Sequence, residues 1–184
     1  MNFFPAVIIL LILLNQSGRA QSRPEKIKSN AVAMNVSTQK ENALAHAIFS
    51  ALVKKDENEW AAMYPTNDEF KTILQRMLHE QATELTKTKM DEMLQQREKE
   101  AAVCYKNEYR ELMKQAGKLG INWKNAVFEK FEYDASPTEK LNLLYLNGKI
   151  FFSCKQQQFV IEGIEAIEME SGYRLQSVKG IKRL

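Results

Sequence analysis

The sequence predicts an α+β protein in which N-terminal helices pack on a curved antiparallel sheet of four to five strands. Two observations support this fold class. Apolar residues in the segment 38–116 recur with the 3.6-residue period of amphipathic helices. From Gly117 onward they shift toward alternation, with many aromatic and β-branched residues. We therefore expect one domain over 38–184, with a helical half at 38–116 and a sheet half at 120–184, which is large enough to bury a core.

Three capping boxes mark helix starts in the first half. In each box an N-cap oxygen precedes a Glu by three positions: Thr38 and Glu41, Asp56 and Glu59, Thr66 and Glu69. The first box predicts a helix that ends near Lys55. The second predicts a short helical turn around Trp60, which Pro65 ends.

The third helical segment is too long for a single helix. After Thr66 no Gly or Pro occurs before Gly117. One unbroken helix would be about 75 Å long, whereas a compact domain of this size is about 40 Å across. Thr83, Thr86 and Thr88 are poorer helix formers than the residues around them. We therefore expect two helices, at 67–82 and about 87–116.

The sheet half contains runs typical of strands, at 121–133, 141–146, 149–154, 158–169 and 173–181. Asn147-Gly148 is a strong hairpin signal, and Ser171-Gly172 predicts a second tight turn. Alternatively, 141–154 is one strand with a bulge at Asn147-Gly148, which leaves four strands. The isoleucine spacing in 158–169 would also suit a helix. Because Gly163 interrupts this run between β-rich neighbours, we predict a bulged strand.

The N-terminal residues predict export. Phe3 to Leu14 is an apolar run that is followed by small and polar residues, as in a secretory signal peptide (residues 1–20) cut after Ala20. The run is too short to span a bilayer as a helix. Residues 21–37 are polar and predict a flexible leader. We therefore expect a periplasmic or secreted protein with no stable membrane insertion after cleavage.

The charge pattern argues against nucleic acid as a partner. The chain has 26 Lys and Arg against 23 Asp and Glu, and removal of residues 1–20 leaves 25 bases against 23 acids. Acids and bases are interleaved throughout 87–111, and Lys179, Lys182 and Arg183 form the only local excess. A nucleic-acid binder usually concentrates its bases on one face.

The two cysteines, Cys104 and Cys154, can pair in only one way. An oxidising compartment would permit the disulfide, which on the chain-entropy model would contribute about 4 kcal/mol. The alternative is two half-buried thiols. Both readings remain open at this point.

Three segments resemble a known superfamily. They are Lys55-Asp56 through Pro65-Thr66, Gly120-Ile121-Asn122-Trp123-Lys124 leading into Phe131-Glu132-Tyr133, and the closing Gly172-Tyr173-Arg174-Leu175. In these, and in the order of helices before sheet, the chain is similar to the NTF2-like, cystatin-like superfamily of small exported bacterial proteins. The resemblance implies a cone with a pocket at its wide end, which some relatives use for small apolar ligands or proton transfer. The long helical segment 85–116 departs from that pattern, and it would cap the opening or serve as a protein-contact surface.

No catalytic constellation is visible in the sequence. The two histidines, His46 and His79, lack the spacing of a zinc protease site, so we predict no metal and no cofactor. If a ligand cavity exists, its polar lining would come from four aromatic residues: Tyr64, Trp123, Tyr133 and Tyr145. Core packing is the alternative role of the same residues.

We therefore expect an exported noncatalytic binding or protein-interaction module, whose partner is an unknown protein or a small apolar ligand. The alternative is a small-molecule pocket with acid–base catalysis by Asp134, Glu132 or Glu162, because burial raises a carboxyl pKa toward neutrality. The last helix carries an apolar stripe that is expected to pack on the sheet: Ala102, Tyr105, Tyr109, Leu112 and Ala116.

Overall fold

A computed structural model describes residues 31–78, 84–138 and 143–184, and it confirms the α+β class. The helices are α2 (Ala31–Lys54), α3 (Glu57–Ala61), α4 (Asn67–Leu78), α5 (Glu84–Lys118) and the 3-10 turn η1 (Trp123–Asn125). The strands are β1 (Ala126–Pro137), β2 (Leu144–Cys154), β3 (Gln157–Met169) and β4 (Gly172–Arg183). The predicted signal peptide and residues 21–30 of the predicted leader lie outside the described residues.

Two of the three predicted capping boxes begin helices. Asp56 accepts hydrogen bonds from Glu59 N and Asn58 N at 2.9 Å, and Thr66 and Glu69 bond reciprocally at 2.8 and 3.2 Å. The Thr38 box does not begin a helix, because α2 begins at Ala31. No Gly or Pro lies between Ala31 and Thr38, so nothing in that stretch stops the helix from extending toward the N-terminus.

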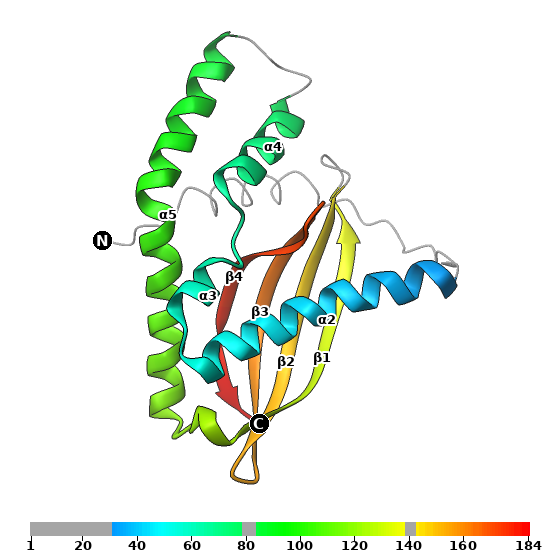
Figure 1. Ribbon diagram of the computed structural model, residues 1–184, viewed down its shortest axis with the longest axis vertical. Coiled ribbons are helices and arrows are strands. Elements are labelled where there is room, and N and C mark those ends of the chain that lie inside the picture. Colours follow the sequence, from blue (N-terminus) through cyan, green and yellow to red (C-terminus); the bar gives the residue numbers. More distant parts are fainter. Residues whose placement is uncertain (1–30, 79–83, 139–142) are drawn as a thin grey trace, which may run out of the picture.

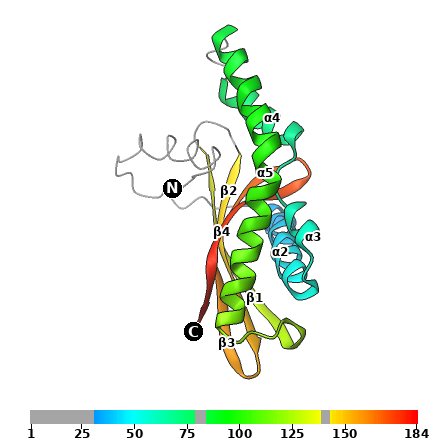
Figure 2. The ribbon, with the colours of Figure 1, turned by 90° about the vertical axis from the view of Figure 1, so that its left-hand side faces the viewer.

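The break in the long helical segment falls slightly earlier than predicted. α4 ends at Leu78 and α5 begins at Glu84, so Thr86 and Thr88 lie inside α5. Residues 79–83 lie outside the described residues. Helix propensity is a weak constraint that packing overrides. α4 and the first half of α5 lie side by side and project beyond the sheet (Figures 1 and 2).

The sheet has four antiparallel strands in the order β1-β2-β3-β4. The predicted hairpin at Asn147-Gly148 is wrong, and the four-strand alternative is correct, because β2 runs through this dipeptide as one strand. The bulge of that alternative does not lie in β2, because the register shift between Gly148 and Ile150 places its extra residue in β3. Neither Asn147 nor Gly148 has the positive φ that a type I′ turn requires. The β2–β3 turn lies instead at Lys155 and Gln156, whose φ values are 51° and 65°.

The bulged strand predicted around Gly163 is confirmed. Gly163 has a φ of 64° and no partner in either neighbouring strand's register, while Ile161 and Ile164 on both sides of it remain paired. An added Cβ here would lie 2.6 Å from the Cβ of Lys179. The position therefore requires glycine for both its conformation and its lack of a side chain.

The core lies between the sheet and its helices. α2 and α3 cover one face of the sheet, and α5 runs beside β4 (Figures 1 and 2). Phe49 of α2 contacts the rings of Trp123, Phe128 and Phe152 at centroid distances of 6.2, 5.6 and 5.7 Å. Aromatic side chains thus fill the space beneath α2.

Candidate functional site

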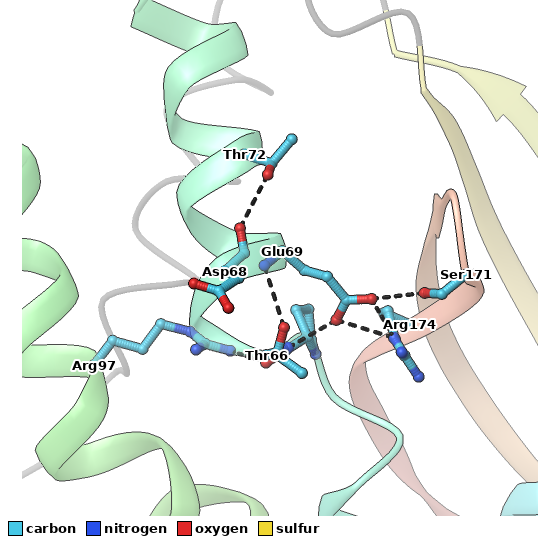
Figure 3. A network of polar contacts seen from close by, with 8 residues as sticks. Thr66, Asp68, Glu69, Thr72, Arg97, Ser171 and Arg174 are labelled. Carbon is cyan, nitrogen blue, oxygen red and sulfur yellow. Dashed lines mark hydrogen bonds and ion pairs between the residues drawn. The ribbon is translucent and has the colours of Figure 1, made fainter.

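Polar side chains gather at the corner where α3 passes into α4. Glu69, in the first turn of α4, binds two residues of the sheet's last hairpin: Ser171 Oγ donates to it at 2.6 Å and Arg174 Nε at 2.9 Å (Figure 3). Its second oxygen accepts from Thr66 N. Burial raises the pKa of Glu69, but the bonds from Ser171, Thr66 and Arg174 outweigh that effect and lower it to about 2. The corner is thereby fastened to β4.

Replacing Glu69 with Gln is expected to lower the free energy of unfolding at pH 7 by about 1 to 2 kcal/mol. The folded pKa of about 2 lies below the ordinary value of 4.5. The ionised carboxylate therefore stabilises the fold above pH 4.5, and this stabilisation is lost as the pH falls toward 2. Urea unfolding at pH 7 and pH 2.5 measures the effect. Glu170→Gln is the control, because its side chain is 95% exposed. An equal loss at both pH values would contradict the assignment.

Arg97 of α5 reaches the same corner from the other side. It donates to Asn67 Oδ1 at 2.6 Å, to the carbonyl of Pro65, and to Tyr105 Oη at 2.9 Å. Its guanidinium also lies 4.6 Å from the ring centroid of Phe70. Arg97 is 7% exposed, so it acts as an internal link between α5 and the corner rather than as a surface cation.

The buried Tyr64 and the half-buried Glu108 lie next to this corner and, together with Arg97 and Tyr105, form what we call the corner cluster. Tyr64 is 3% exposed and stacks on Tyr105 at a centroid distance of 3.7 Å. Its hydroxyl donates to Glu108 of α5, which also accepts from Val178 N at 3.0 Å. Burial raises the pKa of Glu108 to about 7, the hydrogen bonds from Tyr64 and Val178 lower it, and the nearby Glu165 raises it. A carboxyl group with such a pKa changes charge near neutral pH.

The four predicted pocket residues do not meet in one place. Tyr64 lies in the corner cluster, and Trp123 is buried against Phe152 at a centroid distance of 5.4 Å. Tyr133 stacks on Phe131, and burial together with Glu41 raises its pKa. Tyr145 of β2 lies near Glu165 of β3, and burial and Glu165 raise its pKa. Glu165 also acts on Glu108, the partner of Tyr64, so Tyr145 and Tyr64 are linked through these two carboxyl groups, whereas Trp123 and Tyr133 lie elsewhere.

The carboxylates considered for catalysis lie at the surface. Glu132 and Asp134 are exposed residues of β1, and Glu132 is paired with Lys130 at 2.5 Å. Glu162 pairs with Lys182 at 2.5 Å, and its hydrogen bond to that lysine lowers its pKa. None of the three is buried in the way that raises the pKa of a general acid. Within the described residues no group of three or more His, Cys, Asp or Glu side chains is arranged to hold a metal ion.

Cys104 and Cys154 are both free, so the disulfide alternative is not realised. Cys154 is buried at the end of β2, where its thiol donates to Asn122 O at 3.4 Å. Cys104 lies half-buried on α5, and burial raises the pKa of its thiol. A raised pKa disfavours the reactive thiolate. The two thiols therefore belong to separate local environments.

The predicted stripe on α5 packs as expected along most of its length. Tyr109, Leu112 and Ala116 are buried, and Tyr105 is half-buried in the corner cluster. Ala102 is exposed. The packed half of α5 thus ends close to Tyr105. No helix in the described part of the chain is long and apolar enough to cross a membrane.

The two edges of the sheet differ in how their backbone groups are satisfied. Three outward-facing amides of β4 have partners: Leu175 N donates to Met63 O at 2.9 Å, Val178 N to Glu108 at 3.0 Å, and Ile181 N to Gln115 at 3.0 Å. In the described ranges the backbone of β1 pairs only with β2. One edge is therefore closed by the turn that follows α3 and by α5, and the other is open.

Sequence reasoning missed Glu108, Arg97 and the open edge. A signal for Glu108 was present, because it shares a helix face with Tyr105 and Leu112 at spacings of three and four. Comparison with protein families, curated proteins and solved structures finds no match.

Proposed function

We propose that this protein is a noncatalytic interaction module that binds an extended polypeptide segment along the open edge of β1. The observation that supports this function is the contrast between the two sheet edges. β1 spans twelve residues, and within the described ranges its backbone has no partner beyond β2. An unpaired edge is a template that another chain completes by adding a strand.

The surroundings of β1 favour a specific ligand over indiscriminate pairing. The β1–β2 register shifts between Phe128 and Lys130, which bends the strand. Lys130, Glu132 and Asp134 place charges along the same strand, and charges and bulges of this kind disfavour edge-to-edge aggregation. A partner segment must therefore match both the bend and the charges.

Helix α2 adds a second element to the proposed site. Its first turns extend past β1 on the helix-bearing side of the sheet (Figure 1). A strand added next to β1 would lie beneath this projecting end. Main-chain hydrogen bonds would supply affinity, and alternate side chains would face α2 and solvent.

Export and the superfamily relationship remain predictions that complement this proposal. The signal peptide would place the module in the periplasm or outside the cell. The NTF2-like resemblance would make its sheet the curved wall of a cone. The small-molecule alternative has less support, because Trp123 and Tyr133 lie apart from Tyr64 and Tyr145, and the space beneath α2 holds aromatic side chains.

Selection from a displayed library of ten-residue peptides, followed by amide chemical-shift mapping, tests the proposal. Bound peptides are expected to shift the amides of β1 and to leave those of β4 near their free positions. Recovery of no peptide above background, or mapping to another surface, would contradict the proposal.

A pair of proline substitutions supplies the matched control. Asp134 and Ala135 are adjacent exposed residues of β1, so the amide of one faces β2 and the amide of the other faces outward. Asp134→Pro and Ala135→Pro should thus differ. The variant whose amide faced β2 loses a ladder hydrogen bond and is less stable, whereas the variant whose amide faced outward keeps its stability but loses peptide binding. Full binding by both variants would contradict the proposed site.

A further inference from the structure

Two side chains of α5 hold this helix against the edge of β4. Glu108 accepts from Val178 N at 3.0 Å, and Gln115 accepts from Ile181 N at 3.0 Å. The two residues lie seven positions apart, which is two helical turns, so they project from the same face of α5. The contacts are alike in geometry, but only the one made by Glu108 involves a group that titrates.

The titratable and charged groups facing Glu108 come from three elements. Tyr64, which follows α3, donates its hydroxyl, and Glu165 of β3 contributes a second negative charge. On α5 itself, Tyr105 and Cys104 lie close enough for Glu108 to raise their pKa values. None of these groups is a cation. Arg97, the basic residue of the corner cluster, is bound to Pro65 and Tyr105 instead.

An ionised Glu108 is therefore poorly accommodated in this position. Its two hydrogen bonds favour the carboxylate, but removal from water and the charge of Glu165 disfavour it more strongly. Water is within reach of α5, because the neighbouring Arg110, Glu111 and Lys114 are exposed. A small outward movement of α5 would hydrate the carboxylate and break its bond to Val178.

We propose that Glu108 is a proton-dependent latch: the protonated carboxyl group keeps α5 closed on the edge of β4, and its ionisation opens this contact. Gln115 does not titrate, so its contact with Ile181 N stays in place and acts as the hinge of the same interface. Opening would release Val178 N and separate Tyr64 from α5.

The direction of the pH effect follows from the pKa shift. The folded pKa of about 7 lies above the ordinary value of 4.5. The fold therefore holds this proton more strongly than the unfolded chain does. The closed contact is most stable below pH 4.5, and it weakens as the pH rises through 7.

Hydrogen exchange of the Val178 amide, measured by NMR from pH 5.5 to 8.5, tests the latch. After correction for the intrinsic exchange rate, protection in the wild-type chain is expected to fall at least about tenfold, the factor that corresponds to one pKa unit. In Glu108→Gln, a neutral acceptor of the same shape, protection should change less than twofold over this range. Protection in the wild type that is independent of pH would overturn the proposal.

Gln115→Ala is the matched control on the same helix face. It should lower the protection of Ile181 at every pH and leave the pH response of Val178 intact. Loss of that response in Gln115→Ala would overturn the proposal, because the effect would then reflect general loosening of α5. A carboxyl ¹³C titration of wild-type Glu108 gives a second readout that needs no variant. Its midpoint must coincide with the loss of Val178 protection, and a midpoint near 4.5 would overturn the proposal.

Discussion

Replacement of Phe152 with Ala is expected to lower the free energy of unfolding by about 3 to 5 kcal/mol, the range found for truncation of a buried Phe. Phe152 is 0% exposed and contacts three rings: Phe49 at 5.7 Å, Trp123 at 5.4 Å and Phe159 at 5.4 Å. The substitution leaves a cavity at the meeting point of α2, η1 and the sheet. Urea unfolding monitored by circular dichroism measures the loss.

The neighbouring Phe151 provides the control for this prediction. Its side chain is half-buried on the opposite face of β2, where Lys130 lies over its ring at 4.7 Å. Phe151→Ala should lower the free energy of unfolding by less than about 2 kcal/mol. If the two variants lost equal stability, the alternation of β2 described above would be wrong.

Gly163→Ala is expected to lower the free energy of unfolding by about 2 to 4 kcal/mol, because strain and overpacking act together. Gly163 has a φ of 64°, in the left-handed region. The new methyl group would also lie 2.6 Å from the Cβ of Lys179, an atom fixed by the backbone of β4. Thermal and urea unfolding of the variant measure the effect.

Gly117→Ala is the matched control for Gly163. Gly117 lies near the end of α5, has no atom within 4 Å of a built Cβ, and does not have a positive φ. Alanine there should leave stability unchanged or raise it by up to about 1 kcal/mol, since it is the better helix former. A loss of stability at Gly117 as large as at Gly163 would show that the bulge is not responsible.

The sequence predicted those features of the fold that depend on local chemistry. The Thr66 capping box forms as expected, because an N-cap oxygen and its reciprocal Glu lie close together in the chain. The bulge at Gly163 was predictable for the same reason. Each signal involves residues only a few positions apart. At Asp56 only the N-cap bonds form, since Glu59 binds Lys54 and Asp56 N donates to Ala51 O.

Features decided by distant contacts were not predictable from local signals. Asn147-Gly148 is a hairpin signal, yet it lies inside β2, where Gly148 makes room for the ring of Phe131. The turn falls at Lys155-Gln156, a pair with no turn signature in the sequence. Tertiary packing thus overrode turn propensity, as it often does for short signals.

The candidate site was recognised only in part, because its residues come from separate elements. Tyr64 was among the predicted site residues, but its partners Glu108 and Val178 lie far along the chain. The other three predicted residues, Trp123, Tyr133 and Tyr145, are aromatic and have no common location. Residue type alone does not show which side chains meet.

The unequal edges of the sheet limit how copies of this chain could join through strands. A head-to-tail filament requires the open edge of one molecule to pair with the opposite edge of the next, and repetition of that contact produces a fibre. Here the opposite edge already donates its amides to Met63, Glu108 and Gln115. If β1 accepts an added strand as proposed, growth by strand addition would therefore stop after that strand.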